Sequence, residues 1–438
     1  MSELAALLEQ DPFQAYVYSY PHKTAYRALD PAVDLRALWA EEDRSALFVY
    51  LHVPFCEQRC GFCNLFTSVQ PREAVVDDYL TALERQAVAL ERALRPLRVA
   101  RMAIGGGTPT FLPPAQLERL FAVAERLGAS GVPCSVEASP TTADAARIAL
   151  LARHGVTRVS IGVQSAFAHE TAALHRHQDP RQVEAALGAL RAARIPTVNA
   201  DLIYGLAGQT ADSLIESIER VIAWGANELY LYPLYVRPLT TLGRRGTAAG
   251  ADRLDLYRAA RDHLRRRGWR QATMRMFRAP DAPDGADGTG RVYRCQDDGM
   301  VGLGPGARSY TRGLHYASPY AVAQGAVRDL IARWSAQDEA DFSVARHGFT
   351  LDGDDQRRRW IMLSILEGDL DLDAYQERFA STPLADHPHL AEAIAAGLVT
   401  VDGRWWRLSA SGMERSDVLG QWLYSPRVAA LMRDWQPT

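Results

Sequence analysis

Between about Ala46 and Leu234, short β-rich runs alternate with longer amphipathic segments. The expected strands are Leu47–His52, Val99–Ile104, Cys134–Glu137, Val156–Ile161, Thr197–Ile203 and Glu228–Leu234. In the segments between these strands, leucine and alanine recur three and four residues apart, as on a helix face that packs against a sheet. The expected helices are Val76–Leu94, Ala115–Leu127, Ala143–His154, Pro180–Ala193 and Asp212–Trp224. Strands that alternate with helices form parallel sheets with right-handed crossovers, so the sequence predicts an α/β fold.

The six βα units predict a partial (β/α)6 barrel over residues 46–240. In such folds the functional residues follow the carboxyl ends of the strands. Residues 1–45 are expected to form a lead-in, and residues 241–335 an extension of the barrel with a glycine-rich segment, Gly302–Gly306. Residues 336–438 combine helical patterns with two short β runs, which predicts a mainly helical, winged-helix-like appendix.

Composition excludes several classes of function. The 438 residues carry 49 basic and 52 acidic side chains, a balance that gives no reason to expect nucleic-acid binding. No run is apolar enough for a membrane span, and the start lacks a secretory signal, so we expect a cytoplasmic protein. Lys23 is the single lysine in the sequence. A phosphate loop of the Walker type is therefore absent, and any Schiff-base chemistry would have to use Lys23.

Three of the five cysteines stand together as Cys56, Cys60 and Cys63, with the spacing C-x3-C-x2-C directly after the first expected strand. Three thiolates on one loop can hold three irons of a [4Fe–4S] cluster and leave the fourth iron without a protein ligand. An open coordination position is typical of catalytic rather than structural metal sites. It could chelate the amino and carboxylate groups of S-adenosylmethionine (SAM), whose cleavage yields a 5′-deoxyadenosyl radical.

The alternative is a zinc site in which His52 supplies a fourth ligand. Zinc sites usually combine two separated Cys or His pairs, and the sequence has no second pair. Of the remaining cysteines, Cys134 lies inside an expected strand and is interpreted as a core residue, whereas Cys295 stays unassigned.

Further motifs follow the expected strands in order: Tyr50-Leu51-His52-Val53-Pro54-Phe55 before the cysteines, then GGGTPT from Gly105, VEASP from Val136, SIGVQS from Ser160 and DLIYGL from Asp201. With the cysteine loop, these blocks resemble the radical SAM superfamily, and within it the oxygen-independent coproporphyrinogen oxidase (HemN) and HemW branch. The resemblance covers residues 46–235 well and the rest of the chain more weakly.

The resemblance implies roles for particular residues. Cys56, Cys60 and Cys63 would hold the cluster, Gly106 would touch the methionyl group of SAM, and Arg176 would reach its carboxylate unless it is an ordinary surface arginine. Glu137 ends the third expected strand, where a carboxylate can accept both hydroxyls of a ribose unless it is merely solvated. The other expected SAM contacts are Tyr50, Phe62, Gly107, Thr108, Gln164, Asp201 and Tyr235. Phe62, Gly107 and Thr108 would line a second SAM site, and no catalytic residue is assigned.

The sequence departs from the coproporphyrinogen oxidases at two points. Those enzymes carry a fourth cysteine two residues after the third, where this chain has Leu65. The glutamine of their second-SAM motif aligns with Gly290. An aromatic stretch, Tyr16–Tyr26, and the segment Tyr293–Gly299 further resemble a distinct subfamily labelled coproporphyrinogen-oxidase-like.

Three functions remain open. The first is a radical SAM oxidoreductase that abstracts hydrogen from a small organic substrate with carboxylates, such as a tetrapyrrole, and takes electrons from reduced flavodoxin or ferredoxin. The second is a HemN-like methyltransferase that uses two SAM molecules. The third is a HemW-like chaperone that binds heme.

Overall fold

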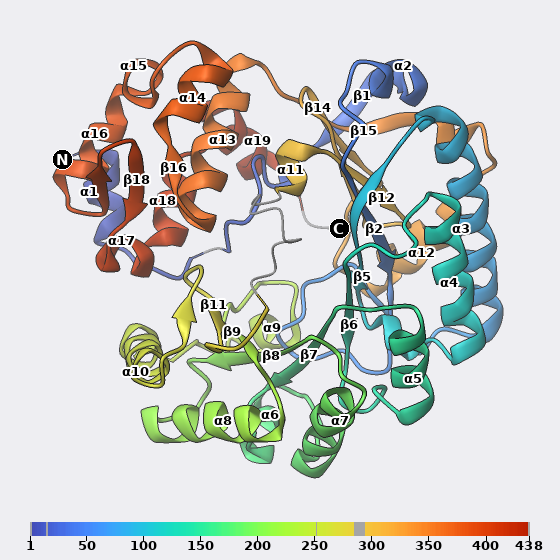
Figure 1. Cartoon of the computed structure of the whole chain (residues 1–438), viewed down its shortest axis with the longest axis horizontal. Helices are drawn as coiled ribbons and strands as arrows, with labels where there is room; N and C mark the ends of the chain where they lie inside the picture. The colour runs from blue at the N-terminus through green and yellow to red at the C-terminus, as the bar shows by residue number, and fades with distance from the viewer. Residues whose placement is uncertain (1, 15, 251, 284–293, 437–438) are drawn as a thin grey trace.

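The computed structural model describes residues 2–14, 16–250, 252–283 and 294–436. A 13-stranded sheet runs in the order β1-β15-β14-β13-β12-β2-β5-β6-β7-β8-β9-β11-β10 and is open between its end strands (Figure 1). Its central strands, β12, β2, β5, β6, β7, β8 and β9, pair in parallel. The sheet is therefore a partial, open barrel with antiparallel extensions at both edges.

The six strands predicted from the sequence are all present: β2 (Leu47–Val53), β5 (Val99–Gly106), β6 (Cys134–Ala138), β7 (Arg158–Gln164), β8 (Thr197–Tyr204) and β9 (Glu228–Pro233). The glycine-rich extension adds β12 (Met300–Leu303), which lies parallel to β2. The antiparallel strands are β1 (Arg27–Asp34), β10 (Arg270–Gln271), β11 (Met276–Arg278), β13 (Arg308–Tyr310), β14 (Leu314–Ala317) and β15 (Val344–Thr350). The α/β partial barrel is confirmed.

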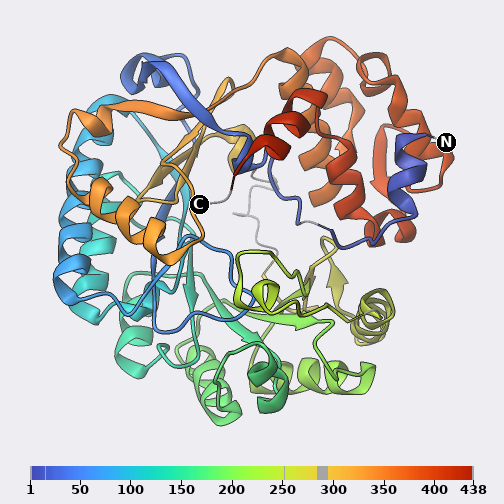
Figure 2. The ribbon, with the colours of Figure 1, turned by 180° about the vertical axis from the view of Figure 1, so that it is seen from behind.

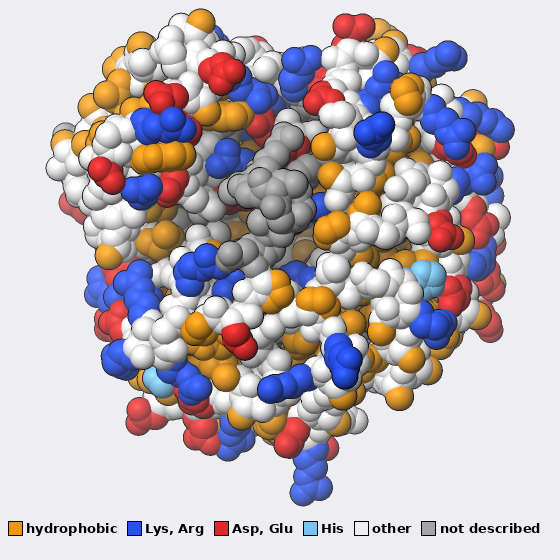
Figure 3. All heavy atoms as spheres, in the orientation of Figure 1, with side chains coloured by type: hydrophobic (Ala, Val, Ile, Leu, Met, Phe, Trp, Pro, Cys, Tyr) orange, Lys and Arg blue, Asp and Glu red, His pale blue; other side chains and the backbone are white. Residues whose placement is uncertain are grey.

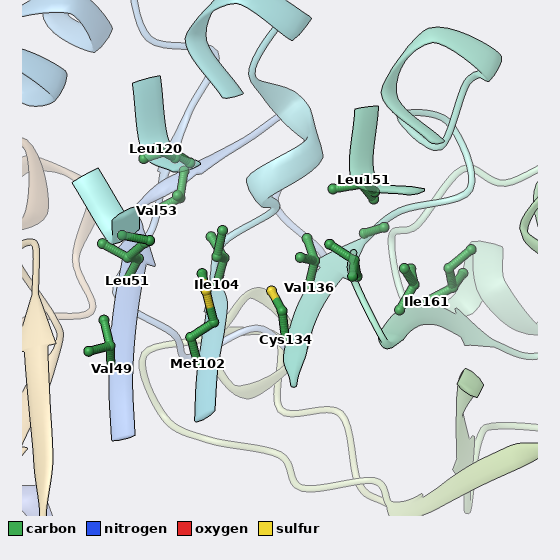
Figure 4. Packing of buried hydrophobic residues seen from close by; sticks show 14 of the residues in the cluster. Val49, Leu51, Val53, Met102, Ile104, Leu120, Cys134, Val136, Leu151 and Ile161 are labelled. Carbon is green, nitrogen blue, oxygen red and sulfur yellow. The ribbon is translucent and has the colours of Figure 1, made fainter. Parts of the chain in front are cut away.

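Helices cover the outer face of the parallel strands (Figure 1). They are α3 (Glu73–Leu94), α4 (Pro114–Arg126), α5 (Ala145–Arg153), α6 (Ala168–Ala173), α7 (Pro180–Ala192) and α8 (Ala211–Trp224). Alternate strand residues, such as Val49, Ile104 and Val136, pack against them in one core (Figure 4). Because side chains alternate between the two faces of a strand, the intervening residues point into the barrel interior.

Residues near both ends of the chain build a second body with its own apolar core. It contains α1 (Glu3–Leu8) and the C-terminal helices α13 (Gly353–Glu367), α14 (Leu372–Phe379), α15 (Pro383–Asp386), α16 (Ala391–Ala395), α17 (Ala410–Glu414), α18 (Ser416–Trp422) and α19 (Pro426–Asp434). A small antiparallel sheet in the order β16-β18-β17 (Leu370–Asp371, Trp405–Leu408, Val399–Asp402) accompanies them. This mixture of helices and a small sheet agrees with the winged-helix-like prediction.

The remaining elements connect these bodies: α2 (Leu35–Ala40), α9 (Thr241–Arg244), α10 (Arg253–Arg266), α11 (Cys295–Asp298) and α12 (Gln324–Ser335), with short 3₁₀ turns at Lys23–Ala25, Pro109–Phe111, Asp341–Ser343 and Pro388–Leu390. From α1 the chain passes between the C-terminal helices and the barrel before it reaches β1 (Figure 2). Within the described ranges, no helix has both the length and the apolar character of a membrane span.

Replacing Gly188 with alanine is expected to stabilise the protein by about 0.5–1 kcal/mol. Gly188 lies on the exposed face of α7, and an added Cβ would meet no atom within 4 Å. Alanine loses less backbone freedom on folding than glycine and has the higher helix propensity. Urea unfolding should show a higher midpoint with an unchanged slope, and a lower midpoint would contradict this description of α7.

Candidate functional site

The cysteine loop leaves β2 and folds back on itself beside the barrel mouth. β3 (Phe55–Cys56) pairs in parallel with β4 (Ser68–Val69), and the Gln70 N–H donates to the Cys56 carbonyl at 3.0 Å. The middle of the loop is tied to the α6 end by the Gly61 N–H, which donates to the Leu174 carbonyl at 2.7 Å. These bonds hold the three thiols at the carboxyl edge of the sheet.

Two of the three thiols in the loop accept a hydrogen bond from a neighbouring side chain. Thr108 Oγ1 donates to Cys56 Sγ at 3.6 Å, and Arg176 Nη1 donates to Cys60 Sγ at 3.2 Å. Burial, and after it the neighbouring Cys63, raise the pKa of Cys56 to about 12. Desolvated thiols that raise one another's pKa favour a bound cation, which lowers the pKa of a coordinating thiol.

The donor set fits a [4Fe–4S] cluster. Three free thiols lie on one loop, with donors aimed at two of their sulfurs. Among the described residues, no three His, Cys, Asp or Glu side chains converge as ligands of one metal ion. A cubane cluster needs no such convergence, because each thiolate binds a different iron. The possible zinc ligand His52 instead directs its Nε2 to the Phe66 carbonyl, 3.1 Å away.

The glycine run at the end of β5 lies so close to β2 and the cysteine loop that no side chain fits there. A Cβ on Gly107 would lie 2.4 Å from the Phe55 carbonyl oxygen and 3.0 Å from Cys56 Sγ. Gly106 has a φ of +113°, and its Cβ would lie 2.7 Å from the His52 ring. Glycine is required at Gly106 by the positive φ and at Gly107 by the close approach of the backbone.

Glu137 and Asp201 point into the barrel interior from neighbouring parts of the sheet. The Gly106 N–H donates to Glu137 Oε2 at 3.0 Å, while Asn199 Nδ2 donates to Asp201 Oδ1 at 2.8 Å. Burial raises the pKa of Glu137 to about 7 and that of Asp201 to about 6. Glu137 nevertheless has accessible surface, so its carboxylate is free to accept further donors inside the barrel.

Gln164 and Arg176 complete the edge next to the cysteine loop. Gln164 ends β7 in the left-handed region, with a φ of +67°, at a register shift between β7 and β8. Arg176 is only 8% exposed, so it is not a surface arginine. Its Nη2 donates to the Gly162 carbonyl at 2.6 Å and its Nε to Gln178 Oε1 at 3.0 Å. These bonds fix its guanidinium beside Cys60.

In the part of the chain that the structure describes, the other predicted residues make no hydrogen bond to the cysteine thiols or to Glu137. Tyr50 points into the interior with its hydroxyl 3.3 Å from His52 Nδ1. Phe62 packs against a small apolar cluster beside the loop. The Tyr235 hydroxyl is occupied by Arg275 and Asp417, so only its backbone is left for a ligand. The prediction at Gly290 concerns a position outside the described residues.

The structure places further basic side chains near the mouth of the barrel, to which the sequence analysis assigned no binding role. Lys23, from the lead-in, and Arg308, from β13, both act on the pKa of His52, and Arg308 also acts on that of Tyr50. In the sequence, Arg308 stands two residues after the glycine-rich segment Gly302–Gly306. The aromatic residues around Lys23 were the signal that could have marked its surroundings as a site.

Replacing Glu137 with glutamine is expected to stabilise the cofactor-free protein at pH 8 and to leave it nearly unchanged at pH 5. The folded pKa of about 7 exceeds the usual 4.5, so the wild-type protein loses stability as the pH rises between these values. Glutamine carries no charge at either pH and can still accept from the Gly106 N–H. Urea unfolding at both pH values tests this, and equal effects at pH 5 and 8 would refute the raised pKa of Glu137.

Comparison with known proteins identifies this arrangement. The profile of the radical SAM superfamily matches residues 50–221. An oxygen-independent coproporphyrinogen III oxidase from Cereibacter sphaeroides is 30% identical over 402 residues, which cover 86% of this chain and 88% of the relative. A heme chaperone HemW from Mycobacterium tuberculosis is 34% identical over 201 residues, which cover 45% of this chain and 52% of the chaperone.

The solved structure of coproporphyrinogen III oxidase (HemN) from Escherichia coli has the same fold, with a TM-score of 0.76, 23% identity and 99% of each chain covered. The fold and the cysteine loop define a radical SAM protein. More narrowly, the chain belongs to the HemN/HemW-like members of the radical SAM superfamily. Membership implies a [4Fe–4S] cluster and SAM as cofactors.

Proposed function

We propose that this protein is a radical SAM oxidoreductase, coproporphyrinogen-oxidase-like, that abstracts hydrogen from a small organic substrate. The observation that carries the proposal is the placement of three loop thiols, a glycine run and Glu137 along one edge of the sheet. When bound, the cluster and SAM supply a 5′-deoxyadenosyl radical. The protein's own residues bind and orient these groups and exclude water.

The expected roles follow the geometry. Cys56, Cys60 and Cys63 would hold the cluster, with Arg176 and Thr108 donating to the sulfurs. Hydrogen bonds of this kind tune the potential of an iron–sulfur centre. Glu137 would accept the ribose hydroxyls of SAM because its second oxygen remains open toward the interior.

The remaining predicted contacts surround that position. Gly106 and Gly107 let the backbone approach the methionyl group, and Asp201 and Gln164 add acceptors and donors at the same edge. Tyr50, Phe62, Thr108 and the Tyr235 backbone complete the proposed SAM contacts. Phe62, Gly107 and Thr108 would border a second SAM molecule if two are bound.

For the substrate, the matched oxidases suggest a tetrapyrrole. Leu65, in place of the fourth cysteine of authentic coproporphyrinogen oxidases, argues that the reaction differs in detail. Reduced flavodoxin or ferredoxin is the proposed electron donor.

The experiment that tests the proposal is anaerobic reconstitution with iron and sulfide, followed by SAM and dithionite. Chromatography should detect 5′-deoxyadenosine in amounts that depend on the reconstituted cluster. A cluster that leaves SAM intact while the protein binds heme tightly would favour a HemW-like chaperone. Two bound SAM equivalents and methyl transfer to the product would favour a HemN-like methyltransferase. A colourless protein that retains zinc would refute the whole assignment.

A further inference from the structure

Glu170 is a buried carboxylate to which the proposed function gives no role. Figure 3 shows acidic side chains spread over the outer surface of one face, where carboxylates are usually found. Glu170, in the first turn of α6, is instead 0% exposed. A carboxylate withdrawn from water is unfavourable unless hydrogen-bond donors satisfy it, so the groups that bind Glu170 indicate what it holds in place.

Three neutral side chains from different elements donate to this carboxylate. Ser165, directly after β7, and Gln209, in the turn after β8, donate to Oε2 from Oγ at 2.6 Å and from Nε2 at 3.2 Å. Ser213 Oγ, in the first turn of α8, donates to Oε1 at 2.6 Å. Glu170 therefore ties α6 and α8 to the carboxyl ends of two neighbouring strands.

Ser165 connects this anchor to the end of β7. Its hydroxyl also accepts from the Phe167 N–H at 3.0 Å, so Ser165 Oγ is bound on both sides. The preceding residue, Gln164, is a proposed SAM contact with a φ of +67°, which non-glycine residues rarely adopt. Such a conformation persists only where the surrounding structure imposes it, and the bond from Ser165 to Glu170 fixes the chain at the next residue.

The helix that carries Glu170 leads in the other direction to the cysteine loop. In the turn that ends α6, the Leu174 carbonyl accepts from the Gly61 N–H at 2.7 Å. Two residues further on, Arg176 Nη1 donates to Cys60 Sγ at 3.2 Å. Because Glu170 holds the first turn of this six-residue helix against α8, it sets where both groups meet the loop.

A further set of hydrogen bonds joins Arg176 to the same strand end. Gln178 accepts from Arg176 Nε at 3.0 Å and donates from Nε2 to the carbonyl of the residue before Gln164 at 2.8 Å. Arg176 Nη2 donates to the Gly162 carbonyl of β7 at 2.6 Å. A shift of the end of β7 would therefore displace Arg176 together with Gln164.

We propose that Glu170 is a positioning residue, which holds Gln164 in place for SAM and Arg176 in place for the cluster. Its carboxylate acts through Ser165 and through α6 and does not touch a reacting atom. The inference rests on the proposed function, which assigns Gln164 and Arg176 their contacts, and it deepens that function by naming what fixes both.

Glu170→Met is the variant that tests this role. Methionine has a similar volume and offers the three donors no comparable acceptor. Glu170→Gln is the conservative variant, since its amide oxygen can accept from the two donors to Oε2. Ser213 can then donate to the Thr210 carbonyl, which lies 3.2 Å from its Oγ. The glutamine variant should therefore remain close to the wild type.

The matched control is Glu414→Met. Glu414 on α17 is also a buried carboxylate, 7% exposed, and it accepts from Arg258 and Arg261 of α10 at 2.7 and 2.6 Å. Its replacement removes a buried carboxylate but none of the hydrogen bonds made by Glu170. The control should lower the free energy of unfolding without the local effects expected for Glu170→Met.

The first readout is amide hydrogen exchange of the cofactor-free protein, followed by mass spectrometry. Buried donors that lose their acceptor favour local opening, so Glu170→Met should speed exchange in residues 57–63 and 174–178 by about tenfold or more. The change should stay below about threefold in Glu170→Gln, and Glu414→Met should show none. Wild-type exchange rates in both segments of Glu170→Met would overturn the inference.

The second readout uses the reconstituted holoprotein. Glu170→Met should bind SAM about tenfold more weakly and should lower the midpoint potential of the cluster, because the cationic hydrogen bond from Arg176 to Cys60 favours the reduced form. Arg176→Met should also lower the potential, and the double variant should match it, since both changes remove the same bond. Additive shifts of the potential would overturn the route through Arg176.

These readouts separate the inference from the proposed function. If the wild type forms 5′-deoxyadenosine but Glu170→Met equals it in exchange and SAM affinity, only the inference fails. If the wild type never cleaves SAM but Glu170→Met loosens the cysteine loop, the proposed function fails and the positioning role remains. Should Glu170→Met not fold, Ser165→Ala removes a single donor and should still speed exchange in the same two segments. Unchanged exchange there would overturn the inference as well.

Discussion

Replacement of Cys56, Cys60 and Cys63 by alanine should abolish formation of 5′-deoxyadenosine. The three thiols are the thiolate ligands that the loop offers to iron, and Thr108 and Arg176 donate to two of them. Enzymes commonly accelerate reactions by about 10⁶-fold or more, so loss of the centre predicts a fall of at least ~1,000-fold. Iron content, visible absorption and 5′-deoxyadenosine should disappear together.

Cys134→Ala is the matched control for these substitutions. Cys134 is buried in the core on β6, away from the loop, so its loss should cost about 1 kcal/mol of stability and leave the cluster intact. Retention of the full iron content by the triple variant would show that other residues hold the iron. Equal loss of the cluster in Cys134→Ala would mean that the triple variant reports only on folding.

The βα part of the fold could be predicted because its signals are local. Alternate residues of β2, β6 and β8 pack against helices, and each of the following helices buries one face. The sequence therefore shows both the hydrophobic periodicity of each element and the order of the elements. The cysteine spacing and the glycine run were equally local. Their meeting at one edge then follows from the parallel sheet, in which all strands end on the same side.

The strands that the sequence did not predict depend on pairing between segments far apart in the chain. β1 pairs with β15, more than 300 residues away in the sequence, and β12 pairs with β2, more than 250 residues away. A short strand such as β12, followed by glycines, has no periodic pattern that distinguishes it from a loop. Lys23 likewise reaches the Tyr320 ring, and Arg308 the Tyr18 ring, only because segments far apart in the sequence fold against one another, which no local signal encodes.

Asp417→Ala is expected to destabilise the protein by about 3–5 kcal/mol, because it leaves a buried guanidinium without its counter-charge. Asp417 on α18 is 1% exposed and accepts two hydrogen bonds from Arg275 Nη2, each 2.7 Å long. The Tyr235 hydroxyl also donates to it, and Arg275 lies over the Tyr16 ring at 4.1 Å. This one carboxylate therefore joins the C-terminal body, the barrel edge and the lead-in.

Urea unfolding of Asp417→Ala, Arg275→Met and the double variant forms a double-mutant cycle, which gives the interaction free energy between Asp417 and Arg275. The double variant should be more stable than Asp417→Ala, since it removes the unpaired charge as well as its partner. Asp417→Asn keeps an acceptor for Arg275 and should fall between the wild type and alanine. If alanine at 417 costs less than about 1 kcal/mol, the value of an exposed ion pair, water must reach Arg275 and the two bodies are not joined there. A large cost that the double variant relieves would mean that this ion pair joins the C-terminal body to the barrel edge.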